Sequence, residues 1–100
     1  MADVWHALSH PVRREVLALL RGGGMSAGEI GARFACTGAT LSGHLRTLRE
    51  ADLVTVEPEG TRRVYRIKLS VAEDALAGLL GLLRYGEAGA PEERAEAPSP

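Results

Sequence analysis

The chain has 100 residues and a formal net charge of −1, with 12 lysines and arginines against 13 acidic residues. With 45% apolar and 25% charged residues, it has the composition of one ordinary globular domain or of half a symmetric oligomer. Its single cysteine excludes an intrachain disulfide framework and a cysteine-rich zinc module, and it fits a reducing cytoplasm.

The N-terminal part predicts two helices separated by a break. The first residues lack the basic region and the long apolar stretch of a signal peptide, so we expect a cytoplasmic protein without membrane insertion. Asp3 can cap a short helix that reaches Leu8, and Pro11 favours a new helix start. Apolar residues then repeat at helical spacing as far as Arg21, and Gly22–Gly24 end the helix.

The middle of the chain predicts two helices joined by a tight turn. Ser26 and Glu29 form a capping box, which opens a helix that runs to about residue 35. After the turn at residues 36–38, which Thr37 caps, a second helix runs to about residue 51. One apolar stripe along this second helix is expected to face inward and consists of Leu41, Leu45 and Leu48.

A β-hairpin is predicted next. Residues 54–57 indicate a strand, residues 57–60 a slightly long turn, and residues 63–69 a returning strand of alternating pattern. We expect one face of the hairpin to be basic, with Arg62, Arg66 and Lys68. This region is locally basic although the whole chain is not, because residues 33–68 carry seven bases and four acids.

A last helix and a tail complete the chain. Ser70 and Glu73 form a second capping box, and the helix that follows carries leucines on more than one face, so it needs a partner. Residues 86–100 are rich in Ala, Gly, Pro and Glu and predict a disordered acidic tail after a folded domain of residues 1–85. The predicted element order is α-α-α-α-β-β-α, a mainly helical chain with a small hairpin.

This order contains a helix-turn-helix followed by a wing. The second helix of such a unit enters the DNA major groove, where small residues permit close approach and short polar or cationic groups reach phosphates and base edges. A basic hairpin can reach the flanking backbone. The candidate DNA-contacting residues are Arg33, Thr37, Gly38, Ala39, Thr40, Ser42, Gly43, His44, Arg46, Arg62 and Arg63.

Residues 7–17, 26–34 and 41–54 resemble the ArsR-type winged helix-turn-helix repressors, in particular their SdpR-like autorepressor branch. The Ser-x-His-Leu-x-x-Leu run from Ser42 to Leu48 is the most specific part, and the resemblance spans roughly residues 3–84. It implies a homodimer that is clasped by its first and last helices and binds a near-palindromic operator to block transcription. The dimer contacts it implies are Val4, Trp5, Leu8, Leu76, Leu79, Leu80 and Leu83.

The chain departs from this family in two respects. Gly38 and Gly43 stand where many members carry a long polar residue and a histidine. We therefore expect DNA binding to depend less on contacts to bases and more on the wing and on phosphate contacts. The helix from residue 26 has no cysteine and the last helix has no histidine, so the ligands of the metal sensors are missing. We therefore expect no metal and no cofactor, and the sequence does not say whether a small molecule or a protein releases the DNA.

Several residues have two readings. His6 and His10 have the spacing of a metal pair, but a helix break between them favours surface or hinge histidines. Cys36 fits a packed turn residue better than a redox switch. Arg13 and Arg14 are equally consistent with phosphate contacts and with a solvated helix start.

Two other classes of function fit the sequence less well than a DNA-binding repressor. A winged-helix module that docks on a protein partner, with its DNA role lost, is the main alternative. An enzyme has almost no support, because no nucleophile–base set or phosphate loop is present.

Overall fold

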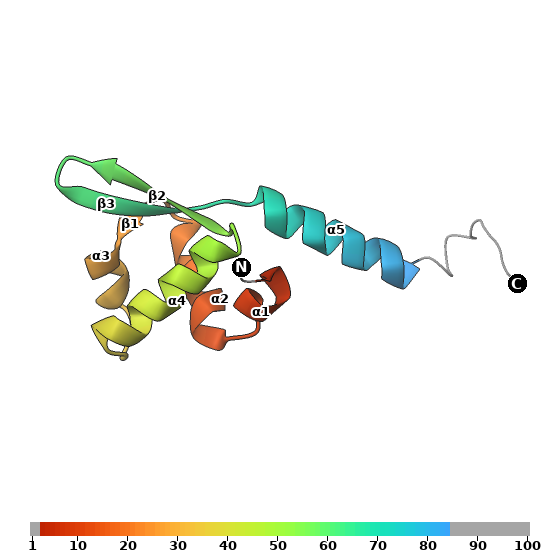
Figure 1. Ribbon diagram of the computed structural model, residues 1–100, viewed down its shortest axis with the longest axis horizontal. Coiled ribbons are helices and arrows are strands. Elements are labelled where there is room, and N and C mark those ends of the chain that lie inside the picture. Colours follow the sequence, from red (N-terminus) through yellow and green to blue (C-terminus); the bar gives the residue numbers. More distant parts are fainter. Residues whose placement is uncertain (1–2, 85–100) are drawn as a thin grey trace, which may run out of the picture.

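The computed structural model describes residues 3–84, which form five helices and a small antiparallel sheet, with the first four helices on one side of the sheet and the last helix extending away from it (Figure 1). The predicted acidic tail, residues 86–100, lies outside the described residues. The predicted order is confirmed, with one additional short strand. The elements are α1 Val4–Leu8, α2 Pro11–Leu20, β1 Met25–Ser26, α3 Ala27–Gly31, α4 Gly38–Glu50, β2 Val54–Glu59, β3 Arg62–Ile67 and α5 Ser70–Arg84.

The first four helices begin where the sequence predicts. A carboxylate oxygen of Asp3 accepts from the backbone N–H of Trp5 at 3.0 Å, and the predicted capping box of α3 is present. Thr37 caps α4 by accepting from the N–H of Thr40 at 3.1 Å. The cap of α2 was not foreseen, since it is His10, whose Nδ1 accepts from the N–H of Val12 at 3.1 Å.

Helix α3 is shorter than predicted, and the expected end near residue 35 is wrong. After Gly31 the chain tightens into single turns, in which the N–H of Arg33 donates to Ile30 O at 3.0 Å and that of Phe34 to Gly31 O at 3.2 Å. Gly31 also lies against the next helix, because a Cβ there would be 3.3 Å from Leu41 Cδ2. The connection to α4 therefore spans residues 32–37 and is longer than the expected tight turn.

The hairpin is tighter than predicted. Glu59 pairs with Arg62, so the turn is Gly60–Thr61, and Gly60 adopts a φ of +65°. The turn predicted at residues 57–60 includes Pro58, but Pro58 lies inside β2. The strand tolerates it because β2 is at the edge of the sheet, where a missing N–H breaks no ladder.

Strand β1 is too short to be seen in a hydropathy pattern. Met25 and Ser26 pair with Tyr65 and Val64, so β3 is the central strand and the sheet order is β1-β3-β2. A Cβ at Gly24 would lie 2.5 Å from Val64 Cγ1, so only glycine allows the chain to pass this close to β3. The sheet thereby ties the hairpin to the start of α3.

The core lies between the helices and the root of the hairpin. The predicted leucine stripe of α4 is confirmed, since Leu41, Leu45 and Leu48 are all buried. Cys36 is half-buried and packs against this core, as expected for a turn cysteine. The buried residues of the cluster are Ala7, Val16, Leu20, Ile30, Leu41, Leu45, Leu48, Ala51, Leu53 and Val54.

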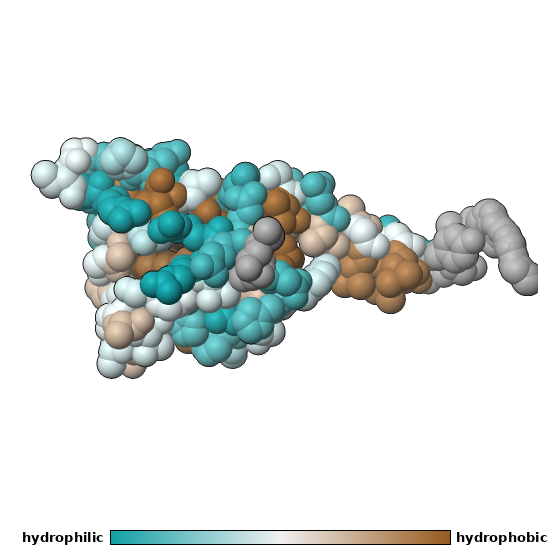
Figure 2. All heavy atoms as spheres, viewed as in Figure 1, coloured by the Kyte–Doolittle hydropathy of each residue, from teal (hydrophilic) through white to brown (hydrophobic). Residues whose placement is uncertain are grey.

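Helix α5 projects away from this body (Figure 1) and buries none of its residues within the described chain. The predicted Ser70 cap would make Val71 the first helical residue, but α5 begins at Ser70. Its first helical hydrogen bond runs from the N–H of Glu73 to Leu69 O at 2.8 Å. Its apolar surface is visible along the projecting helix (Figure 2). No helix within residues 3–84 has the length and apolar character needed to cross a membrane.

Candidate nucleic-acid interface

The outward face of α4 carries small and polar side chains. Because the leucine stripe holds the opposite face in the core, Ser42, Gly43 and Arg46 are exposed. A Cβ at Gly43 would meet no atom within 4 Å, so no packing inside the described chain requires a glycine there. Together with Arg33, the exposed members of the predicted set at this end are Thr37, Gly38, Ala39, Thr40, Ser42, Gly43 and Arg46.

The structure brings the parts of this predicted surface to one side of the molecule. The α3–α4 connection, the N-terminal end of α4 and the tip of the hairpin all lie on the side opposite α5 (Figure 1). Residues that are separated by about 30 positions in the chain can therefore face one extended ligand.

His44 differs from its neighbours on α4. It is half-buried, and its ring centroid lies 4.4 Å from that of His10 on the adjacent helix start. Its Nδ1 lies 3.2 Å from Arg13 Nη1. Since a guanidinium only donates, Nδ1 of His44 must accept, and the ring is turned toward α2 rather than outward.

Arg13 is buried, with 8% of its surface exposed, so both readings of it from the sequence are wrong. Its Nε donates to Ala7 O at 2.8 Å and its Nη2 to His6 O at 3.0 Å. These carbonyls belong to the end of α1. His6 O also accepts from the N–H and the Oγ of Ser9, at 3.1 and 2.7 Å. Arg13 therefore joins α1, α2 and α4. This role could not be predicted from the sequence, because two of the three acceptors are backbone atoms and the third, His44 Nδ1, is far along the chain.

Burial is the main cause of a lowered pKa at His44, and the positive charge of Arg13 and the nearby His10 act in the same direction. The folded state thus favours the neutral imidazole. This agrees with the hydrogen bond, because a protonated Nδ1 could not accept from Arg13.

This shift predicts a loss of stability in mild acid. Because the folded-state pKa of His44 lies below the unfolded value of about 6.5, the unfolded chain binds the extra proton first. The contribution of His44 to the free energy of unfolding is complete above that value and declines as the pH falls through it. Urea unfolding between pH 7.5 and 5.5 should show a smaller decline in His44→Gln than in the unaltered chain. The exposed His6→Gln is the control, and equal declines in all three proteins would contradict the assignment.

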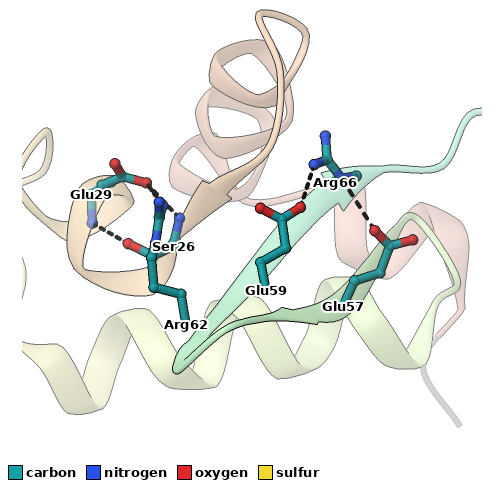
Figure 3. A network of polar contacts seen from close by, with 6 residues as sticks. All are labelled: Ser26, Glu29, Glu57, Glu59, Arg62 and Arg66. Atoms are coloured by element: carbon teal, nitrogen blue, oxygen red, sulfur yellow. Dashed lines mark hydrogen bonds and ion pairs between the residues drawn. The ribbon is translucent and has the colours of Figure 1, made fainter.

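The three residues of the expected basic face, Arg62, Arg66 and Lys68, have acidic partners, which the sequence did not indicate. Arg66 Nη2 lies 2.7 Å from Glu59 Oε2, and its Nε lies 3.2 Å from Glu57 Oε1 (Figure 3). Lys68 pairs with Asp52 at 2.8 Å. The expected basic face is therefore largely compensated by carboxylates.

Arg62 and Arg63 are neighbours in the chain with different surroundings. Arg62 Nη2 lies 2.5 Å from Glu29 Oε1 on α3 (Figure 3). Arg63 is exposed on the opposite face of β3 and forms no ion pair with any residue between 3 and 84. Sequence reasoning also missed Val64, which is buried although arginines flank it along the strand.

His6 and His10, for which the sequence favoured surface or hinge histidines over a metal pair, have separate surroundings. His10 uses Nδ1 to cap α2, and His6 is exposed on α1. Within residues 3–84 no three histidine, cysteine or acidic side chains gather closely enough to hold a metal ion.

The predicted dimer residues form an apolar surface on α1 and α5. Trp5 is 47% exposed, and along α5 the exposed fractions are 53% for Leu76, 37% for Leu79 and 66% for Leu83. Val4, Leu8 and Leu80 are half-buried. This much exposed leucine on one projecting helix is unusual for a monomer.

Comparisons with known proteins agree with this architecture. Residues 8–57 match the family described as a helix-turn-helix domain. The transcriptional repressor SdpR of Bacillus subtilis (strain 168) is 32% identical over 87 residues, which are 87% of this chain and 97% of that protein. A solved structure of a possible transcriptional regulator for arsenical resistance is 30% identical with a TM-score of 0.71, covering 92% of this chain and 100% of the other. An ArsR-like transcriptional regulator from Rhodococcus sp. RHA1 shares the fold, with a TM-score of 0.80 at 24% identity over 85% of this chain and 78% of that one.

Proposed function

Because this chain belongs to the ArsR-type family of winged helix-turn-helix repressors, we propose that α4 is its recognition helix and the β2–β3 hairpin its wing. The protein is a DNA-binding transcriptional repressor, not an enzyme. The family membership confirms the prediction made from the sequence and disfavours the alternative of a module that acts only through a protein partner.

The proposal depends on one observation above all. The first turns of α4 expose only small side chains, with the single long side chain of Arg46 beyond them, while the leucines of α4 are buried in the core. Gly43 lies in the middle of this face with open space around it. A narrow, exposed helix face with short hydroxyl groups and one long cation suits insertion into a major groove, where Arg46 can reach a phosphate or a guanine.

We infer that the functional unit is a homodimer formed through α1 and α5. The apolar α5 has no partner within the described residues, and a second copy buries the same stripe on both chains. Two recognition helices then read a near-palindromic operator with half-sites about 34–36 Å apart. The dimer acts in the cytoplasm, where its DNA is and where its cysteine stays reduced.

The experiment that tests this function is selection of bound fragments from random duplex DNA, followed by binding of the selected site and of the region upstream of the chain's own gene. We expect a symmetric site, and an affinity that falls steeply with salt because phosphate contacts release counterions. Failure to enrich any sequence would overturn the proposed function.

Substitution of Gly43 by glutamate tests whether the exposed face of α4 contacts DNA. Gly43→Glu should stabilise α4 or leave it unchanged, since glycine is a poor helix former by about 1 kcal/mol. It should nevertheless reduce affinity for the selected site at least tenfold, because a carboxylate is driven against phosphates and base acceptors. The matched Gly43→Gln has the same size without the charge and should lose less. Unchanged binding by Gly43→Glu would mean that this face does not touch DNA.

A further inference from the structure

The hairpin offers two adjacent arginines to a DNA backbone, and the structure distinguishes them. On β3 the even-numbered side chains Arg62, Val64 and Arg66 lie on one face, and Arg63 lies on the other, opposite Pro58 in the register. Arg62 is directed at α3, since its guanidinium meets Glu29 (Figure 3).

The capping box with Ser26 orients the side chain of Glu29 independently of Arg62. Its Oε1 accepts from the N–H of Ser26 at 2.8 Å, and its own N–H donates to Ser26 Oγ at 3.2 Å. The backbone N–H of Ser26 is the main cause of a lowered pKa at Glu29, to which Arg62 adds. The carboxylate is therefore ionised and oriented by the capping box, and Arg62 binds to a prearranged acceptor.

The ion pair is half-exposed, with 51% of the Arg62 side chain and 52% of the Glu29 side chain open to solvent, so it contributes little to stability. Its effect is on position. It fastens the tip of the hairpin to the first turn of the helix-turn-helix, beyond the short β1–β3 ladder that ends at Ser26 and Val64.

Among the arginines of the wing, only Arg63 forms no ion pair within residues 3–84. Arg66 faces Glu57 and Glu59, and Arg62 faces Glu29, so three carboxylates surround two arginines (Figure 3). These carboxylates repel a phosphate that approaches the face on which they lie. Arg63 is on the other face and has no carboxylate partner within residues 3–84.

We propose that Arg63 is the wing residue that contacts the DNA backbone, and that Arg62 is a positioning residue that acts through Glu29. This rests on the proposed function and refines it, since the sequence names both arginines as candidate DNA contacts. Arg63 of each protomer releases one counterion on binding, whereas Arg62 keeps its carboxylate partner and releases none.

The test is the salt dependence of binding to the selected duplex, measured for the unaltered chain and for matched single variants. Arg63→Ala removes one phosphate contact from each protomer of the dimer, so the fall of log K with log salt should become less steep by about 1.8. Affinity should drop more at low salt than at high salt. Arg62→Ala should leave the slope within error, with an affinity loss of similar size at every salt concentration. Arg62→Lys retains the ion pair and should restore affinity.

A second readout tests the route through Glu29. Arg62→Ala and Glu29→Ala each release the hairpin tip, so the double variant should lose no more affinity than the stronger single variant. A reduced slope in Arg62→Ala, or an unchanged slope in Arg63→Ala, overturns the assignment while the repressor function stands. An unaltered chain that binds no duplex overturns both proposals.

Discussion

A glutamate in place of Leu83 is expected to split the repressor into monomers and to reduce its affinity for the selected operator by about 100-fold or more. Leu83 lies on the α5 stripe that also carries Leu76, and 66% of its surface is exposed in the single chain. Burying such a side chain against a second copy contributes about 1.5–3 kcal/mol, and a charge in its place must be desolvated instead. The symmetry of the dimer applies this cost twice.

DNA affinity falls because a monomer has only one recognition helix, whereas the dimer has two. When two recognition helices are linked, the second binds at a high effective concentration, which typically adds a factor of 10² to 10⁴ in overall affinity. A monomer retains the contacts of one half-site only. Sedimentation or light scattering gives the mass in solution, and a mobility shift with the full operator gives the affinity.

The neighbouring Leu82 is the matched control. It is 72% exposed, even more than Leu83, yet it lies off the stripe shared by Leu76 and Leu83 on a helical projection. Leu82→Glu should therefore leave the protein dimeric and the operator bound. Dimers that persist in Leu83→Glu, or that dissociate equally in both variants, would show that α5 does not pair along this stripe.

The parts of the fold that the sequence predicted are those set by local chemistry. Asp3, Ser26 and Thr37 act as caps because their acceptors lie within three residues of the amides they satisfy. The inward stripe of α4 followed from helical spacing alone. The outward face of α4 could be predicted for the same reason, since it is what remains when the leucines are placed in the core.

The parts that the sequence did not predict depend on partners far along the chain. Glu29 and Arg62 are separated by 33 positions, so the expected basic wing gave no hint of its compensation by acids. Strand β1 has two residues and exists only because β3 is there to pair with it. The sequence also names His44 as a candidate DNA contact, because nothing local marks Arg13 as its partner.

Replacing Arg13 by methionine is the second change for which we expect a large effect, this time on stability. Methionine fills much of the same volume but donates no hydrogen bonds, so Ala7 O and His44 Nδ1 lose the donor that Arg13 supplies. His6 O also loses Arg13 but keeps the N–H and Oγ of Ser9 as donors. Bonds from a charged donor contribute about 1.5–3 kcal/mol each, and buried acceptors left unsatisfied are costly, although water can replace part of the loss. We expect the free energy of unfolding to fall by about 3 kcal/mol, a large share of the total for a domain of this size.

Thermal unfolding at fixed protein concentration measures this loss, which should lower the Tm by roughly 12–24 °C for a domain of this length. Arg14→Met is the matched control, since Arg14 Nη1 also donates to a carbonyl of α1, Leu8 O, at 2.8 Å, but from an exposed position where water replaces it. The salt slope of DNA binding should stay unchanged in Arg13→Met below its Tm, because the buried guanidinium does not reach a phosphate. A reduced slope with an unchanged Tm would instead restore the reading of Arg13 as a phosphate contact, and would require α1 to move away from α4 on DNA.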